Sequence, residues 1–556
     1  MSVTYIGITI GPIYQTMSLT SSPAGLWMAS SVFSWIARSL IEALTRPRED
    51  SRPLVPREAF AAPFFTLDAA GRVSAADPND PKDVCSDMER KGVGLFHDRI
   101  IYRADQSDVN RSLHAAAIAR DEVTDTLAAR LSANTGKTHE EVRQWLERYL
   151  VIYAAAVAVP EDSSPLTCIG NYMSGLELEP SFPTREKDNL LLRLMENVTA
   201  ENAPRDHRNA AVKSSFLVTA LGNNGADWML YESGSDSIRD ISSIARTGGD
   251  GGKFKCQDYY TVLKSDGDSM GEMLKTLKTP PEIMRYSRQC LKFCADAAKV
   301  LLHYGALPIY AGGDDLLAIM PVLGFNSETG ETCDIFSMVE RLRTLFNKSF
   351  EEAREAHGGK PTISFGISIQ HCKSPIYEAL ECAGDMLYRA KSGAKNACAI
   401  SLRKHSGQQA LFYETKMDLH KDEARNYENL CEAIGRQSLL GLNPGTAQML
   451  RSAGYQIARF EPLFKEALRL EEDARRQTLI NLFDNLFDNV GQASFKSYLE
   501  KLRNIVIQVF RETPAPKPSE TCKDEEKRLD AHFKIIMDQV QGIVRFLHFM
   551  SEEASS

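Results

Sequence analysis

Residues 307–320, LPIYAGGDDLLAIM, decide the fold of this chain. Residues 307–310 and 316–320 are short apolar runs, and between them lie two glycines followed by Asp314 and Asp315. Two apolar runs joined by a short turn that contains glycine are typical of a β-hairpin. The stretch therefore predicts a hairpin that carries two carboxylates in its turn.

The segments on both sides of this hairpin predict alternating strands and helices. Their order contains βαββαβ, which is the ferredoxin-like arrangement. The predicted elements are a strand at 259–264, a helix from 280, the two hairpin strands, a helix at 335–356, a strand at 362–369, a helix from 375 to about 391, and a final strand at 397–402.

The chain has 556 residues, which is too long for one ordinary hydrophobic core. Two to four domains are therefore expected. Residues 1–45 predict a strand, a loop and a helix. Residues 46–83 are rich in Pro, Asp and Ala and predict an exposed insertion. Residues 111–157 and 406–556 are predicted to be mainly helical. The fold class is therefore α+β.

The composition restricts the partners and the compartment. The net charge is -9 and the pI about 5.8, so nucleic acid would have to be bound by local patches or by partner subunits. The eleven cysteines include no CxxC pair, which favours a reducing compartment and argues against a zinc ribbon. The apolar N-terminal run lacks a preceding basic segment, so we expect a cytoplasmic protein.

A second group of carboxylates follows the first strand of the βαββαβ unit, at Asp266 and Asp268. Because that strand lies beside the hairpin in this fold, Asp266 is expected to meet Asp314 and Asp315. Clustered carboxylates repel one another unless a cation neutralises them, and hard oxygen ligands suit Mg²⁺ or Mn²⁺. Two such ions can activate a hydroxyl and stabilise a departing pyrophosphate. The alternative is two solvated loops, but the combined spacing favours a metal site.

Glycines and lysines near these carboxylates suggest a phosphate site. Gly312 and Gly313 fit a turn that a triphosphate approaches closely. Lys391 and Lys395 lie where the last helix meets the last strand, and could reach the triphosphate as point charges. They could equally only stabilise the C-terminus of that helix, and the spacing does not decide between the two.

Several of these motifs resemble those of nucleotidyl cyclases. AGGDDLLAIMP at 311–321 resembles their GGDEF or GGDD hairpin, and SFGIS at 364–368 matches the strand between the motifs. YRAKSGAKN at 388–396 resembles a segment of diguanylate cyclases whose first lysine binds phosphate. More specifically, residues 259–274, YYTVLKSDGDSMGEML, and the opening segment 8–41 resemble the large polymerase-cyclase subunit of type III-B CRISPR effector complexes.

This resemblance implies two ferredoxin-like palm domains packed face to face. They would be a non-catalytic palm with a helical insertion at 1–240 and a catalytic palm at 250–405, followed by a helical domain at 406–556. It also implies that a complex with other subunits makes cyclic oligoadenylate from ATP when target RNA binds. Guide RNA and target RNA would be held mostly by those other subunits.

The resemblance also implies roles for the site residues. Asp266 and Asp314 would bind the metals, Asp315 would complete the acidic hairpin, Gly267 would offer its carbonyl, and Lys391 would hold phosphate. The full nucleotide-binding set expected is Gly267, Asp268, Gly312, Gly313, Lys391 and Lys395.

The sequence departs from that family in two respects. Many members carry an N-terminal HD nuclease, but here the pair His97–Asp98 has no further His and Asp ligands spaced for a metal site. We therefore expect no DNase activity and a structural hydrogen bond for His97. A zinc module is also doubtful without CxxC, and Cys290 and Cys294 are predicted to be core residues.

Three alternatives remain open at this point. The same carboxylates could serve adenylyl transfer from ATP to S-adenosylmethionine, because both reactions attack an ATP α-phosphate. The chain could instead be a catalytically silent scaffold subunit, although intact carboxylates argue against that. A free-standing diguanylate cyclase is disfavoured by the GGDD ending and the long N-terminal half.

Overall fold

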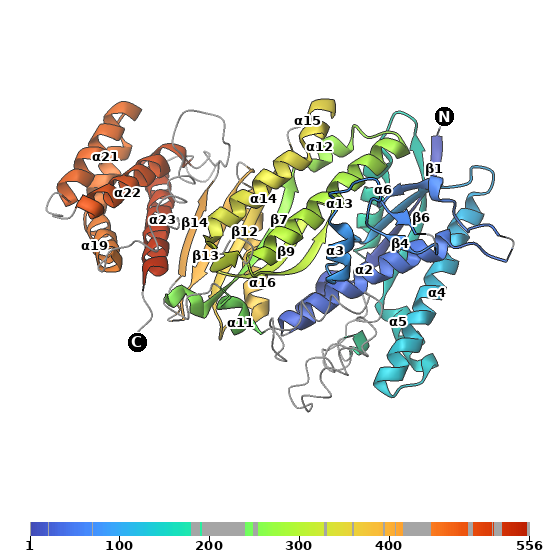
Figure 1. Cartoon of the computed structure of the whole chain (residues 1–556). Helices are drawn as coiled ribbons and strands as arrows, with labels where there is room; N and C mark the ends of the chain where they lie inside the picture. Colours follow the sequence, from blue (N-terminus) through green and yellow to red (C-terminus); the bar gives the residue numbers. More distant parts are fainter. Residues whose placement is uncertain are drawn as a thin grey trace.

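The computed structural model describes most of the chain (Figure 1). The end of the predicted first domain lies largely outside the described residues. Apart from a few single positions, the segments not described are 179–188, 192–239, 248–253, 327–330, 358–360, 393–394, 415–445, 488–492, 516–524 and 553–556.

The N-terminal sheet has the ferredoxin-like order and is antiparallel throughout. Its central strand, β1, pairs with β5 on one side and with β6 on the other, and β2 pairs with the outer edge of β5. Helices lie between these strands in the chain, as a βαββαβ unit requires. The elements are β1 (Ser2–Gly11), α2 (Pro23–Thr45), β2 (Phe60–Ala62), β5 (Arg99–Arg103), α4 (Val109–Thr135), α5 (His139–Tyr149) and β6 (Val151–Pro160).

Helix α2 begins at a capping serine followed by a proline. The side chain of Ser22 accepts a hydrogen bond from the Gly25 amide at 3.0 Å, and Pro23 follows it at the first helical position. The apolar positions that predicted this helix are buried, so they form its core-facing stripe. They are Phe33, Ile36, Leu40, Ile41 and Leu44.

The second sheet contains the predicted βαββαβ unit and two added strands. The spatial order of the strands is β14-β13-β12-β7-β9-β8. The ferredoxin-like unit consists of β7, β8, β9 and β12, and β12 is its last strand along the chain. Helix α16 then crosses over to β13, which lies parallel to β12, and β14 extends the sheet beyond residue 405. The strands are β7 (Tyr259–Asp268), β8 (Leu307–Gly312), β9 (Asp315–Pro321), β12 (Thr362–His371), β13 (Cys398–Arg403) and β14 (Gln409–Glu414).

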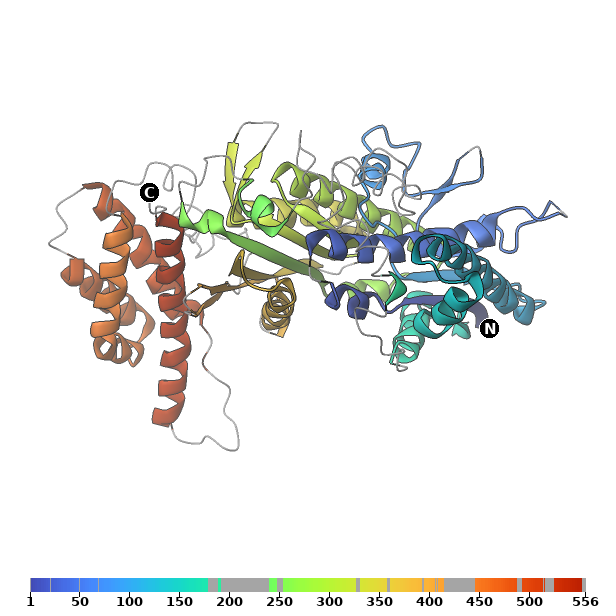
Figure 2. The ribbon, with the colours of Figure 1, turned by 90° about the horizontal axis from the view of Figure 1, so that it is seen from below.

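Helices cover both faces of this second sheet. Figure 2 shows α16 (Ile376–Ser392) on the opposite side from α13 (Pro280–His303) and α14 (Ile335–Ser349). The predicted core positions Cys290 and Cys294 are buried on α13. The sheet is therefore enclosed by apolar contacts, while its strand ends stay accessible.

The two palms pack against each other through α13 of the second and the 60–80 segment of the first. The Phe64 amide donates to Ser287 Oγ at 2.8 Å, and Lys292 Nζ lies 2.7 Å from the carboxylate of Asp80. The prediction that residues 46–83 form an exposed insertion is therefore wrong in part. Phe60–Ala62 form β2, a buried strand, because the adjoining palm covers a segment whose composition alone indicated a loop.

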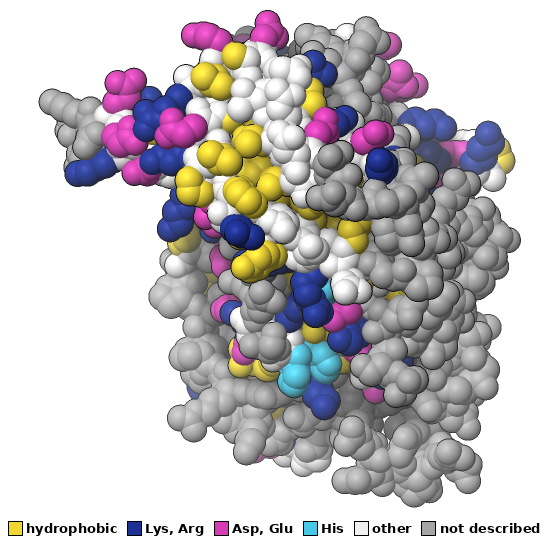
Figure 3. All heavy atoms as spheres, turned by 90° about the vertical axis from the view of Figure 1, so that its left-hand side faces the viewer, with side chains coloured by type: hydrophobic (Ala, Val, Ile, Leu, Met, Phe, Trp, Pro, Cys, Tyr) yellow, Lys and Arg dark blue, Asp and Glu magenta, His cyan; other side chains and the backbone are white. Residues whose placement is uncertain are grey.

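The C-terminal residues form a helical unit that packs on β14 through α23, as Figure 1 shows. Glu552, directly after α23, lies 2.8 Å from Lys255 Nζ and so ties the chain end to the second palm. On the face that this unit presents, hydrophobic side chains gather in the middle, and Lys, Arg, Asp and Glu side chains lie mainly around them (Figure 3). None of the described helices is long and apolar enough to cross a membrane. The helices are α19 (Thr446–Arg459), α20 (Glu461–Leu468), α21 (Glu472–Phe487), α22 (Ala493–Glu512) and α23 (Glu525–Ser551).

Candidate metal and nucleotide site

Three carboxylates meet at one end of the second sheet, and we call them the acidic triad: Asp266, Asp314 and Asp315. Asp266 lies near the end of β7, Asp314 lies in the β8–β9 turn, and Asp315 begins β9. Because β7 pairs with β9, the two acidic segments emerge side by side. One oxygen of each carboxylate lies within 4.8 Å of the others.

Glycines allow the backbone to come this close to the triad. Gly313 has φ of +70°, in the left-handed region that glycine adopts without strain. A Cβ on Gly267 would lie 2.5 Å from Asp314 Oδ2, and a Cβ on Gly312 would lie 2.5 Å from the Tyr310 hydroxyl. Real Cβ atoms essentially never come this close to another atom, so a larger residue at either position would displace the Asp314 or Tyr310 side chain.

The triad is electrostatically strained without a cation. Burial and the neighbouring charge of Asp266 raise the pKa of Asp314 from 3.8 to about 6. Burial and the charges of Asp314 and Asp266 also raise the pKa of Asp315, although this residue remains exposed on one side. A divalent cation would relieve this repulsion, because it stabilises the ionised forms. The oxygen-only donor set fits Mg²⁺ or Mn²⁺.

Lys391 lies at the triad. Its ammonium group, in the last turn of α16, donates to the carboxylate of Asp266 and to the Gly267 carbonyl, the latter at 3.1 Å. Lys395, by contrast, is exposed on the loop after α16, and its charge acts on Glu272. The structure thus brings the first of the two predicted lysines to the triad.

Asp268 points into the protein. Its Oδ2 accepts hydrogen bonds from Thr362 Oγ1 at 2.9 Å, Ser364 Oγ at 2.8 Å and the Asn396 amide at 2.8 Å. The carboxylate therefore joins β7, β12 and the loop before β13, and its buried position makes it a support of the site. The sequence placed it in the nucleotide-binding set.

Two cavities meet at the triad, and both are shared between the palms. The α1 cavity, of about 670 Å³, takes its name from α1 (Ile13–Ser18), which lines it together with Lys264, Asp266 and Tyr377. The His97 cavity, of about 370 Å³, is lined by His97, Gly313 and Asp314 among others. Both are also lined by Asp98, Tyr310 and Asp315.

The first palm therefore contributes side chains that the sequence interpretation left out of the site. Tyr14 presents an exposed ring in the α1 cavity, with Lys264 Nζ 5.0 Å from the ring centroid. Burial lowers the pKa of Lys264. Asp98 reaches both cavities, although it was predicted only as part of a structural loop. The His97–Asp98 pair in the sequence was a signal that could have drawn attention to Asp98. Which cavities Asp98 faces, however, depends on how the two palms pack together.

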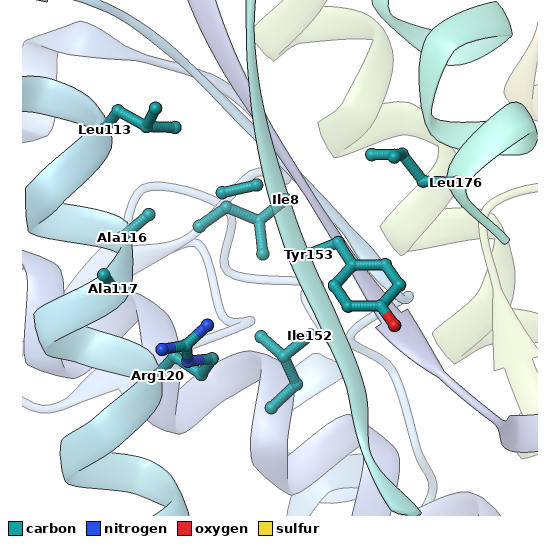
Figure 4. Close-up of a pocket in the computed structure, with 9 residues that line it drawn as sticks. Ile8, Leu113, Ala116, Ala117, Arg120, Ile152, Tyr153 and Leu176 are labelled. Atoms are coloured by element: carbon teal, nitrogen blue, oxygen red, sulfur yellow. The ribbon is translucent and has the colours of Figure 1, made fainter. Parts of the chain in front are cut away.

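A third cavity lies away from the triad, between α4 and β6 (Figure 4). Its volume is about 320 Å³, and apart from Arg120 and Tyr153 its walls are aliphatic. None of the residues that line it is a carboxylate, histidine or cysteine, so it offers no metal-binding chemistry.

Comparison with known proteins supports the identity of the second palm. Residues 259–399 match the family model described as Cas10/Cmr2, second palm domain. The chain is 32% identical over 176 residues to the CRISPR system Cmr subunit Cmr2 of Pyrococcus furiosus, covering 27% of this chain and 19% of that protein. It is 25% identical over 174 residues to the CRISPR system single-strand-specific deoxyribonuclease Cas10/Csm1 (subtype III-A) of Thermococcus onnurineus, covering 28% and 20%. The matched segments thus span about a fifth of these two relatives.

The solved structures that match the chain include the Csm1–Csm4 cassette in complex with one ATP. That match has a TM-score of 0.45 and 13% identity, and covers 99% of this chain and 70% of the other. The Csm1–Csm4 subcomplex of the type III-A CRISPR-Csm interference complex matches with a TM-score of 0.44 and 12% identity, over 99% and 70%. Residues 259–399 thus resemble the second palm domain of the Cas10/Cmr2 family, and part of the chain is similar in sequence to the CRISPR proteins Cmr2 and Cas10/Csm1.

Proposed function

We propose that this chain is a subunit of a type III CRISPR complex that acts in the cytoplasm and makes cyclic oligoadenylate from ATP when target RNA binds. The observation that carries the proposal is the acidic triad, with one oxygen of each carboxylate within 4.8 Å of the others, at the junction of two cavities. A reaction that joins two nucleotides needs both of them held against one set of metal ligands, and the two cavities offer a place for each.

The metal ions would be held by Asp266, Asp314 and Asp315, with the Gly267 carbonyl as a further ligand. Bound Mg²⁺ or Mn²⁺ supplies Lewis-acid stabilisation of the α-phosphate and of the leaving pyrophosphate. The protein contributes the placement of these oxygens and the close approach of its backbone at Gly312. Asp268 supports this arrangement from behind through its three hydrogen bonds.

The triphosphate would lie near Lys391. This ammonium group contacts the Asp266 carboxylate and the Gly267 carbonyl. If a metal ion bound these two oxygens, the ammonium group would be free to bind a phosphate instead. Gly312 and Gly313 would leave room for the triphosphate at the turn, and Lys395 on the adjoining loop would add positive charge further out.

The partners would be the other subunits of a type III complex. The relatives are named as a Cmr subunit and as the Csm1 component of Csm1–Csm4 structures. With a net charge of -9, this chain would leave guide RNA and target RNA mostly to those subunits. The domains proposed from the sequence are 1–240, 250–405 and 406–556, but β14 pairs with β13 and so extends the second palm past residue 405 to at least Glu414.

DNA cleavage by an HD centre is not part of this proposal. Among the residues that the structure describes, the acidic triad is the group of three or more metal-ligating side chains that lie together, and neither His97 nor Asp98 belongs to it. The chain, assembled with target RNA, should leave single-stranded DNA uncut with Mn²⁺, Ni²⁺ or Co²⁺.

The test is mass analysis of the products from three substrate mixtures: ATP, GTP, and ATP with S-adenosylmethionine. Cyclic oligoadenylate from ATP alone supports the proposal, whereas a product only in the third mixture would identify adenylyl transfer to S-adenosylmethionine. The matched control is Asp314→Ala with Asp315→Ala, which should lower product by about 10³-fold or more at unchanged fold. Near wild-type turnover in this double variant would exclude the triad as the catalytic site.

A further inference from the structure

The loop before β5 brings two polar side chains of the first palm to the catalytic end of the second. His97 lines the same cavity as Gly313 and Asp314, and its neighbour Asp98 lines both cavities. The side chain of His97 is largely buried but keeps 26% of its surface exposed, so part of the ring can meet a molecule in that cavity. The palm without the acidic motifs therefore contributes directly to the walls of the site.

The hydrogen bonds of His97 settle which ring nitrogen carries the proton. The backbone amide of Arg99 donates to Nδ1 at 3.1 Å, so Nδ1 is an acceptor without a proton. Burial, together with the charge of Arg99, lowers the pKa of His97 to about 4, which keeps the ring neutral at physiological pH. A neutral ring with an unprotonated Nδ1 carries its proton on Nε2. His97 thus has one N–H donor left to offer.

The loop is held rigidly enough for that donor to be useful. The guanidinium group of Arg99 donates to the carboxylate of Glu177 at 3.0 Å and to Ser174 Oγ at 3.1 Å, which anchors the loop to the helix after β6. The Ile10 amide donates to the Asp98 carbonyl at 2.9 Å, which ties the same loop to β1. A donor on a fixed loop loses little conformational entropy when it binds a ligand.

We propose that His97 is a positioning residue for the nucleotide that enters the His97 cavity, and that its Nε2 donates a hydrogen bond to an oxygen or ring nitrogen of that nucleotide. This inference rests on the proposed nucleotidyl transfer and adds a first-palm contribution to substrate placement. It differs from the structural role expected from the sequence, in which only Nδ1 would matter.

Two isosteric variants separate these roles. The amide nitrogen of Gln lies near the position of Nε2, so His97→Gln keeps the donor and loses the acceptor for the Arg99 amide. The amide oxygen of Asn lies near the position of Nδ1, so His97→Asn keeps that acceptor, in the geometry of an Asx turn, and loses the donor. The positioning role predicts that the Gln variant stays active, and a purely structural role predicts the opposite.

The experiment measures initial rates against ATP concentration for the full chain in its assembled complex with target RNA and Mg²⁺. We expect kcat/KM to fall by about tenfold or more in His97→Asn, mainly through KM, and to change by less than about threefold in His97→Gln. An Asn variant as active as wild type, or a Gln variant as impaired as the Asn variant, would overturn the inference.

Binding of a non-hydrolysable ATP analogue to the same three proteins provides the second readout. The analogue should bind His97→Asn more weakly than wild type and His97→Gln about equally, and equal binding to all three would overturn the inference. A wild-type complex that binds the analogue but makes no product would instead contradict the proposed function. Melting temperatures of the variants show whether either change acts through the fold.

Discussion

The ammonium group of Lys391, at the end of α16, contacts the carboxylate of Asp266, at the end of β7. The two residues are 125 positions apart in the chain. Asp266 lies on a strand of the second sheet, and Lys391 lies on a helix that packs against this sheet. In this arrangement the lysine is the counterion of a carboxylate that we propose as a metal ligand. Its amine can therefore exchange one partner for another when metal and nucleotide bind.

Lys391→Met should lower kcat/KM for ATP by roughly 10- to 100-fold, because it removes a charge-assisted hydrogen bond to phosphate while keeping an apolar side chain of similar length. Steady-state kinetics on the assembled complex measure this loss. The matched control is Lys395→Met, which removes an exposed lysine from the next loop and should change the rate by less than about threefold. Equal losses in the two variants would show that the phosphate site extends along the loop.

Stability without metal should depend on pH through Asp314. Its pKa is raised from 3.8 to about 6 in the folded chain, so the folded state binds more protons than the unfolded state between these values. The contribution to the free energy of unfolding is therefore present below about pH 4 and is lost as the pH rises through about 6. Thermal unfolding in EDTA at several pH values measures it, with Asp314→Asn as the control in which this part of the pH dependence disappears.

Added Mg²⁺ should stabilise the folded chain more at high pH than at low pH, because it binds the ionised form of the triad. We expect the melting temperature of the wild-type chain to rise by a few degrees at pH 8 and by less at pH 5. Asp314→Asn with Asp315→Asn should show no such rise at either pH. An equal Mg²⁺ effect in the double variant would place the stabilising metal elsewhere in the chain.

Gly267→Ala should lower activity by about 100-fold while the chain stays folded. The added Cβ would lie 2.5 Å from Asp314 Oδ2, so the Asp314 carboxylate must shift and the metal ligands lose their spacing. The control is Gly271→Ala, whose Cβ meets nothing within 4 Å and which also lies near the site, in the short helix α12 (Met270–Leu274). Product formation and far-ultraviolet circular dichroism on both variants test this, and full activity in Gly267→Ala would show that the triad tolerates the displacement.

Asp268→Ala should destabilise the second palm by about 1–3 kcal/mol, because it leaves the Thr362 and Ser364 hydroxyls and the Asn396 amide without their shared acceptor. Denaturant unfolding measures the loss. Asp266→Ala serves as the comparison, since it removes a partly exposed carboxylate that is repelled by its neighbours, and should leave stability nearly unchanged. If Asp268→Ala were fully stable and failed only in nucleotide binding, the residue would belong to the site and not to its support.

The strands and helices of the second palm were predictable from local patterns in the sequence. Alternating apolar runs predicted its strands, and the order of strands and helices required β7 to lie beside the β8–β9 hairpin. That topology is enough to bring Asp266 to Asp314 and Asp315, because strand pairing follows from local patterns and from the short connection of the hairpin. The described helices α19 to α23 lie within residues 406–556, which were predicted to be helical, but β14 at the start of that segment was not predicted.

The side chains that reach the site from outside that unit could not be predicted, because their positions depend on how the domains pack. The burial of β2, the inward turn of Asp268 and the position of His97 and Asp98 in the cavities depend on how the two palms and the α16 crossover pack together. A packing surface between domains leaves no periodic signal in the sequence, because each of its residues meets a partner hundreds of positions away. The sequence around His97 would be the same whether the ring only supports its own loop or also faces a nucleotide. The position of the second palm determines that His97 lines a cavity next to the triad.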